Sequence, residues 1–158
     1  MERHREQELQ ELRQRLLWMG SLAERAVHNA VRALIDGDTK LAESVVEEEA
    51  AINSLQIEID ERALRLLALQ QPMAVDLRMI TATMKINADL ERIGDQAVNI
   101  AQCVHFLLQH PQVKPYIDIP RMSELAEGMV KDALDSFVKR DVNLAKQLNV
   151  LLTQLGVP

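Results

Sequence analysis

The stretch LQELRQRLLWMGSLAERAVHNAVRALIDGD, residues 9–38, decides the fold. Apolar or small side chains recur in it at alternating steps of three and four residues, which is the spacing of a heptad seam along one face of a long helix. These positions are Leu9, Leu12, Leu16, Met19, Ala23, Ala26, Ala30 and Ala33. Asp36, Gly37 and Asp38 then provide a helix stop and an acidic cap, so one helix ends there and another begins.

Two more long helices follow. The second runs from about Thr39 to Gln70, and the third is opened by Pro72 in its first turn and continues to about Gln109. The inward positions of the second are Val45, Ile52, Leu55, Ile59, Ala63 and Leu66. The predicted seam of the third is Met79, Thr83, Ile86, Leu90, Ile93, Ala97, Ile100, Val104 and Leu107. Residues 1–109 are therefore predicted to form an all-α, three-helix bundle of long antiparallel helices, similar to a spectrin repeat.

The rest of the chain repeats part of this pattern. Residues 110–120 contain three prolines and are predicted to form a connector, with a fourth helix beginning near Arg121. Shifting the chain by 103 residues aligns 19–42 with 122–145 without a gap, and nine of these 24 positions are identical. We therefore expect residues 121–158 to hold the first helix of an incomplete second bundle, shortened before the counterpart of Asp95.

Composition narrows the class of protein. With 47% hydrophobic and 27% charged residues over 158 positions, the chain has the balance of a globular domain. The net charge of −6 disfavours a nucleic-acid partner, because phosphate binding needs clustered Lys and Arg. No apolar stretch is suited to membrane insertion, and the charged start and single Cys103 favour a cytoplasmic location.

Three carboxylates stand close together in the third helix, at Asp89, Glu91 and Asp95. Helical geometry places Glu91 and Asp95 on one face, pointing away from the seam through Ile93, and Asn99 extends that row by one turn. Like charges four residues apart repel, so the row favours a bound cation or a basic partner, although a merely solvated helix face has the same pattern. The motifs HExxH, GxxxxGK and GxSxG are absent, and we expect no enzymatic activity.

The run LALQQPMAVDLRMITATMKINADLERIGDQAVNIA, residues 67–101, closely resembles the signature of the PhoU family of phosphate-response regulators. Its marks are QQP, DLR, DLERIGD and NIA, and the likeness extends over about residues 9–148. The resemblance implies a cytoplasmic accessory protein of two similar three-helix bundles. Such a protein represses the phosphate-starvation response by linking the ATPase subunit of a phosphate ABC transporter to a sensor histidine kinase.

The resemblance also implies a site. Some members bind iron or zinc through an E/D-x-x-x-D motif, which Glu91 and Asp95 match here with Asp89 beside them. Glu49 stands where the family commonly has Asp, and Asn99 completes the expected ligand set. The DLR and DLERIGD motifs also contain the residues that we expect to contact a partner protein, namely Asp76, Arg78 and Arg92.

Assembly is predicted from the fourth helix. One side of it carries an apolar row that the second and third helices of its own bundle would normally cover. The row must then dock on the first bundle, pair between chains or aggregate, and we expect a homodimer. The row consists of Leu125, Met129, Ala133 and Phe137. Two alternatives stay open for the whole chain, namely a metal-binding helical bundle that handles iron or zinc and a helical oligomerisation module without any site.

Overall fold

A computed structural model describes residues 2–70 and 72–155, which form five helices and no strand. The helices are α1 (Glu2–Asp36), α2 (Thr39–Gln70), α3 (Ala74–Leu108), α4 (Asp118–Lys139) and α5 (Val142–Gln154). The chain divides between Pro115 and Tyr116 into two compact units, of which the first holds α1 to α3 and the second α4 and α5. The predicted all-α fold is confirmed. No helix in the described ranges is both long and apolar enough to cross a membrane.

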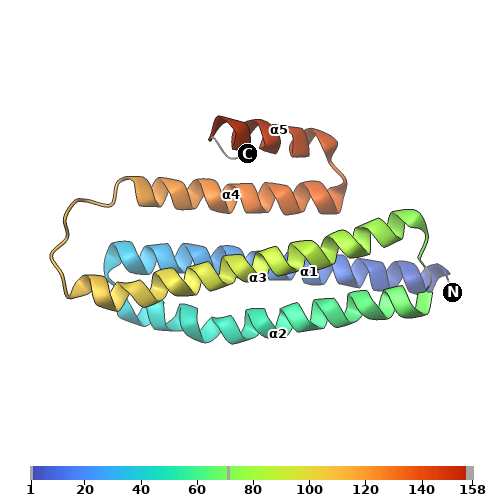
Figure 1. The fold of residues 1–158 in the computed structure, drawn as a ribbon, viewed down its shortest axis with the longest axis horizontal. Helices are drawn as coiled ribbons and strands as arrows, with labels where there is room; N and C mark the ends of the chain where they lie inside the picture. The colour runs from blue at the N-terminus through green and yellow to red at the C-terminus, as the bar shows by residue number, and fades with distance from the viewer. Residues whose placement is uncertain (1, 71, 156–158) are drawn as a thin grey trace. The chain divides into compact units, whose positions relative to one another are not determined.

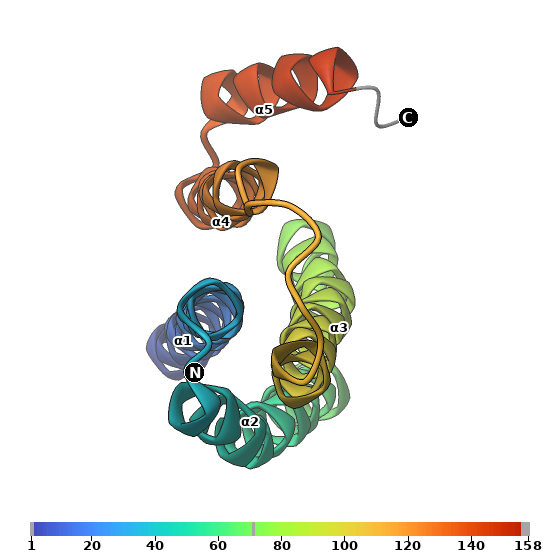
Figure 2. The same ribbon diagram turned by 90° about the vertical axis from the view of Figure 1, so that its left-hand side faces the viewer.

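The first unit is an antiparallel bundle in which each of α1, α2 and α3 packs against the other two (Figure 1). Seen along the bundle, the three helices stand at the corners of a triangle (Figure 2). Every seam position predicted for α1 and α2 is buried, from Leu9 to Ala33 and from Val45 to Leu66. Burial of these two continuous apolar faces supplies most of the core.

The predicted seam of α3 was wrong at every second position from Ile86 onward, and its last position, Leu107, is 39% exposed. Met79, Thr83, Leu90, Ala97 and Val104 are buried as expected. Three further core positions lie one residue later than predicted, at Asn87, Gly94 and Ala101 in place of Ile86, Ile93 and Ile100, and Ile80 and Val98 are buried as well. The three isoleucines are half-buried at the edge of the bundle. The reason is steric, because small side chains on the inner face allow α3 to approach its neighbours closely while the large ones cover the flank.

Two turns in the chain have the same geometry. Gly37 ends α1 with a φ of 64°, and the N–H of Asp38 donates to the Ala33 carbonyl at 2.9 Å. Asp38 then caps α2, since its Oδ1 accepts from the Leu41 N–H at 3.0 Å. This is a Schellman stop followed by an acidic N-cap.

The turn between α4 and α5 repeats these bonds 103 residues later. Arg140 has a φ of 55°, and the N–H of Asp141 donates to the Ser136 carbonyl at 2.9 Å. The Oδ1 of Asp141 accepts from the Leu144 N–H at 3.0 Å. The shift of 103 residues found in the sequence therefore superposes equivalent hydrogen bonds as well as identical residues.

The ends of three elements differ from their predicted positions. Pro72 precedes α3 instead of opening it, because the helix begins at Ala74 with Met73 as its N-cap. The predicted connector ended too late, since α4 begins at Asp118 and holds Pro120 in its first turn, where the missing N–H has no helical partner to lose. Two helices rather than one follow the connector, and α5 aligns with the start of α2.

Candidate functional site

The candidate site is built on a close contact between α2 and α3. Gly94 is buried, and a Cβ placed on it would lie 3.1 Å from the Cδ1 of Ile52. The absent side chain therefore lets Ile52 pack directly on the α3 backbone. Glu49 stands one turn before Ile52 on α2, while Glu91 and Asp95 flank Gly94 on α3. The contact thus brings the carboxylates of two helices to one edge of the bundle.

Electrostatics at this edge are unfavourable for Glu91. Burial raises the pKa of Glu91, and the Asp95 carboxylate raises it further through charge repulsion and a side-chain hydrogen bond. Glu49 adds to the rise from across the helix contact, whereas Arg92 opposes it. A raised pKa means that the fold penalises the charged form of Glu91, so a cation brought to this edge would be attracted.

The corrected position of the α3 core explains why Glu91 is half-buried. With Asn87, Gly94 and Ala101 facing inward, Glu91 and Asp95 lie beside the core, at its border with α2. They were predicted to point away from the seam through Ile93, and because the inner face of α3 lies elsewhere, their direction differs from that prediction by a fraction of a turn. That rotation is what places them next to Glu49.

Acidic residues on the other side of α2 are neutralised by arginines. Arg25 of α1 lies 3.2 Å from Glu48, and Arg15 of α1 lies 3.2 Å from Glu58. By contrast, no ion pair within residues 2–70 and 72–155 includes Glu49, Glu91 or Asp95. These three residues are hereafter called the acidic edge. The bundle thus balances its charges at the α1–α2 border and leaves negative charge at the α2–α3 border.

The remaining residues of the predicted ligand set are not brought to the acidic edge. Asp89 is exposed, and its Oδ1 lies 3.7 Å from the Nη1 of Arg92, three residues away. Asn99 is exposed one turn beyond Asp95. Within the part of the chain that the structure describes, no three His, Cys, Asp or Glu side chains are arranged to hold a metal ion. The geometry therefore does not by itself form the predicted iron or zinc site.

The predicted partner contacts fall into two groups. Arg78 and Arg92 are exposed on α3, whereas Asp76 is half-buried beside Arg5 of α1, with 3.8 Å between its Oδ2 and the Nε of Arg5. Asp76 thus joins the first turns of α1 and α3. Its position gives it a role inside the bundle that the sequence pattern did not indicate.

Sequence reasoning missed Asn87, which is fully buried between α2 and α3. Its Nδ2 donates to the Gln56 carbonyl at 2.9 Å and to the Oδ1 of Asp60 at 3.0 Å, while its own Oδ1 is buried without a partner. A polar side chain at a heptad position was the available signal, because such residues fix the register of neighbouring helices. Sequence reasoning also missed a groove between α2 and α3, whose lining includes Val46 and Ala101.

Comparison with known proteins shows which family the chain resembles. A family model described as the PhoU domain matches residues 16–104 and 119–150. A phosphate-specific transport system accessory protein PhoU homolog from Aquifex aeolicus is 41% identical over 141 residues, covering 89% of this chain and 64% of the relative. A homolog of the same name from Pseudomonas putida is 42% identical over 139 residues, covering 87% of this chain and 54% of the relative. The chain thus spans between about half and two thirds of these relatives.

Solved structures agree with this placement. The crystal structure of PhoU from Pseudomonas aeruginosa superposes with a TM-score of 0.85 at 40% identity, covering 90% of this chain and 68% of that one. The phosphate transport system regulatory protein PhoU from Streptococcus pneumoniae superposes with a TM-score of 0.84 at 31% identity, covering 96% of this chain and 72% of that one. Sequence and fold agree over nearly the whole length, and the chain therefore belongs to the PhoU domain family.

Proposed function

We propose that this chain is a cytoplasmic regulator of phosphate uptake that works by binding other proteins and catalyses no reaction. In this role it represses the phosphate-starvation response when phosphate is plentiful. It does so as an adaptor between the ATPase subunit of a phosphate ABC transporter and a sensor histidine kinase. The observation that carries the proposal is the match to the PhoU domain over residues 16–104 and 119–150, together with relatives named as accessory proteins of phosphate transport.

The charge distribution supports a role in protein contact. The acidic edge holds three carboxylates that form no ion pair with an arginine in the described residues, and Arg92 only partly offsets their repulsion at Glu91. Acids at the α1–α2 border are paired with arginines. Unpaired charge at a rim speeds and orients the encounter with an oppositely charged partner. We propose that the acidic edge contributes to such a contact, with the exposed Arg78 and Arg92 of α3 as further contact residues.

Gene deletion tests the proposed function. In phosphate-rich medium, a strain lacking the gene is expected to express a reporter of the phosphate-starvation response, and the wild-type gene is expected to silence it. Restoration by a Glu91→Lys, Asp95→Lys variant should be reduced. Glu6→Lys, Glu61→Lys serves as the matched control, because it makes the same charge change at two exposed acids, one on α1 and one in the half of α2 away from Glu49. Unchanged reporter expression after deletion would refute the regulatory role.

Metal binding is a second candidate role, favoured by the convergence of Glu49 with Glu91 and Asp95. We propose iron or zinc as the cation. Binding would require the side chains to rearrange, because no three ligands are positioned for a metal among residues 2–70 and 72–155. Elemental analysis of protein purified without chelators should find iron or zinc in the wild type and lose it in Glu91→Ala, Asp95→Ala. Equal metal content in both proteins would refute the site.

The predicted homodimer remains part of the proposal. Its support is the apolar row of α4, in which Leu125, Met129 and Phe137 are half-buried in the described structure. Sedimentation equilibrium of the full chain should give twice the mass of 17.9 kDa. A monomer at all accessible concentrations would contradict it.

A further inference from the structure

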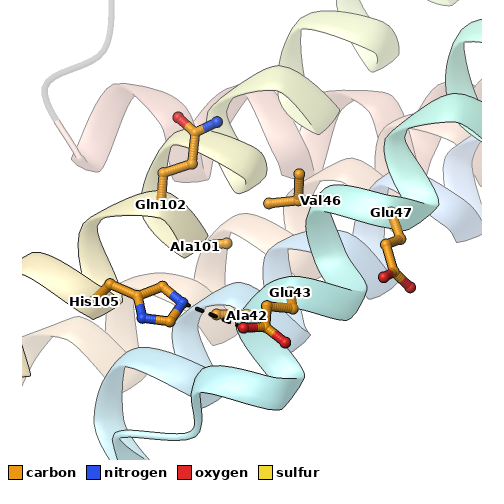
Figure 3. Close-up of a pocket in the computed structure, with 7 residues that line it drawn as sticks. All are labelled: Ala42, Glu43, Val46, Glu47, Ala101, Gln102 and His105. Atoms are coloured by element: carbon orange, nitrogen blue, oxygen red, sulfur yellow. Dashed lines mark ion pairs between the residues drawn. The ribbon is translucent and has the colours of Figure 1, made fainter.

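A groove runs between the N-terminal half of α2 and the C-terminal half of α3 (Figure 3). Its volume is about 340 Å³. The lining residues are Ala42, Glu43, Val46, Glu47, Ala101, Gln102 and His105. Ala42 and Ala101 are buried and form the floor, and Val46 is 37% exposed above them. The floor is therefore apolar and made of small or short side chains.

The rim of this groove is acidic. Glu43 and Glu47 stand on the α2 side, and both are exposed. His105 on the α3 side directs its ring toward Glu43, with 3.7 Å between Nε2 and Oε1 (Figure 3). None of the seven lining residues is Lys or Arg. Glu49 of the acidic edge lies one helical turn beyond Val46, so negative charge continues past the end of the groove.

This combination restricts what the groove can accept. An acidic rim repels nucleic acid and anionic lipid surfaces. The homodimer proposed above rests on the apolar row of α4, so it does not account for a groove whose rim carries Glu43 and Glu47. A cation alone would leave the apolar floor unused, and the described residues offer no three-ligand metal site. An apolar row flanked by positive charge matches both the floor and the rim.

Helix geometry supplies the shape of the occupant. Two antiparallel helices present a groove into which the side-chain ridge of a third helix can pack. Ala42 and Val46 are one turn apart, as are Ala101 and His105, so the groove is about one turn long. It therefore accepts one aliphatic anchor of a helix, with the neighbouring turns of that helix lying over the rim.

We propose that the α2–α3 groove docks a cationic amphipathic helix of a partner protein. An aliphatic side chain of that helix enters between Val46 and Ala101, and flanking Lys or Arg side chains meet Glu43 and Glu47. The proposal rests on the proposed function, since it names the chemistry of a partner for a regulator that acts by contact. It adds a binding surface separate from the acidic edge.

A synthetic peptide pair tests the groove directly. The probe is a helical peptide with leucines four residues apart and lysines on both flanks, and its match carries glutamates in place of the lysines. With the full chain, the lysine peptide should bind and shift the NMR signals of Val46 and Ala101, whereas the glutamate peptide should not. Val46→Asp should weaken binding at least tenfold. Glu43→Lys, Glu47→Lys should do the same, and both positions are exposed, so this variant keeps the fold.

Glu6→Lys, Glu61→Lys makes the same charge change at two exposed positions of α1 and α2 outside the groove and should bind as the wild type does. Equal binding of both peptides, or an undiminished affinity in both groove variants, would overturn the proposal. Shifts at His105 on adding zinc alone would assign the groove to a cation instead. Concentration-dependent self-association abolished by Val46→Asp would assign it to a second copy.

A cellular arm separates this inference from the proposed function. In the deletion strain, the Val46→Asp gene should fail to silence the phosphate-starvation reporter that the wild type silences. If Val46→Asp silences it fully, the groove is not the working contact although the regulatory role stands. If deletion itself leaves the reporter unchanged, the regulatory role fails, and the peptide experiment alone then decides whether the groove binds a cationic helix.

Discussion

The contact of Gly94 with Ile52 makes a quantitative prediction. Gly94→Ala should gain about 0.8–1.0 kcal/mol of intrinsic helix stability. The new Cβ, however, would lie 3.1 Å from the Cδ1 and 3.4 Å from the Cγ2 of Ile52, closer than the optimal carbon separation of about 3.5–4.0 Å. Turning Ile52 away from its rotamer by about 30° costs about 0.5–1.5 kcal/mol. The two effects oppose each other, so Gly94→Ala alone should change the stability by less than about 1 kcal/mol.

Removing the Cδ1 atom separates the two effects. Ile52→Val alone should destabilise the chain by about 0.5–1.5 kcal/mol, because it leaves a gap over Gly94. In the Gly94→Ala background, the same change should cost almost nothing, since the added methyl fills that gap and the 3.1 Å contact no longer exists. We therefore expect a favourable coupling energy of about 1 kcal/mol.

Urea unfolding of the wild type, both single variants and the double variant measures this coupling. Unchanged m-values are needed for the four free energies to be compared. Independent sites add to within about 0.3–0.5 kcal/mol. Additivity within that range would refute the close approach of Ile52 to Gly94, and with it the explanation for the position of Glu49 beside Glu91.

Three further predictions concern charge and caps. Glu91→Gln should stabilise the fold by about 0.5 kcal/mol at pH 7, since repulsion by Asp95 and Glu49 disappears. Because the folded pKa of Glu91 is raised, urea titrations should show this gain vanishing below its ordinary value of 4.5. Arg140→Gly should raise the melting temperature by relieving a left-handed residue, worth about 1 kcal/mol, whereas Gly37→Ala should lower it. Asn87→Asp should lower the melting temperature more than Asn87→Ala at pH 7, because a buried carboxylate would replace the Nδ2 that donates to the Oδ1 of Asp60. In acid, where carboxylates are protonated, the melting temperatures of the two variants should approach each other.

Much of the first bundle was predictable from the sequence because its signals were redundant. In α1 and α2, apolar or small residues recur at the heptad positions from Leu9 to Ala33 and from Val45 to Leu66, and all the predicted positions are buried. The turn after α1 has a glycine where a left-handed residue is needed and an aspartate where a cap is needed. Hydrophobic period and turn chemistry therefore agree, and the structure follows both.

The inner face of α3 could not be predicted in the same way, because two rows of side chains are each compatible with a helix face that packs inward. Ile86, Ile93 and Ile100 form a strongly apolar row, and the row one residue later is polar or small. Hydrophobicity alone favours the isoleucine row as the inner face. The distance between two helices, however, depends on the size of the side chains between them, and the sequence of one helix does not show how closely its neighbour packs. The need for a glycine at position 94 follows only from its contact with Ile52 on α2. In the same way, the buried Asn87 is explained by its hydrogen bonds to Gln56 and Asp60 of α2.

This choice of row also links the two surfaces assigned to function. Asn87, Gly94 and Ala101 are spaced by seven residues along the inner face of α3, and each meets α2 in a different way. Asn87 hydrogen-bonds across the contact and fixes its register, Gly94 lets Ile52 approach, and Ala101 leaves room beneath Val46.

The acidic edge follows from the close approach of Ile52 to Gly94, and the groove follows from the small side chain of Ala101. Had the isoleucine row faced inward, Glu91 and Asp95 would lie farther from α2, and a large side chain would stand in place of the floor at Ala101. Charge and cavity at the α2–α3 border thus have one structural cause. Repacking that border should therefore disturb both surfaces, whereas recharging the rim should disturb binding alone.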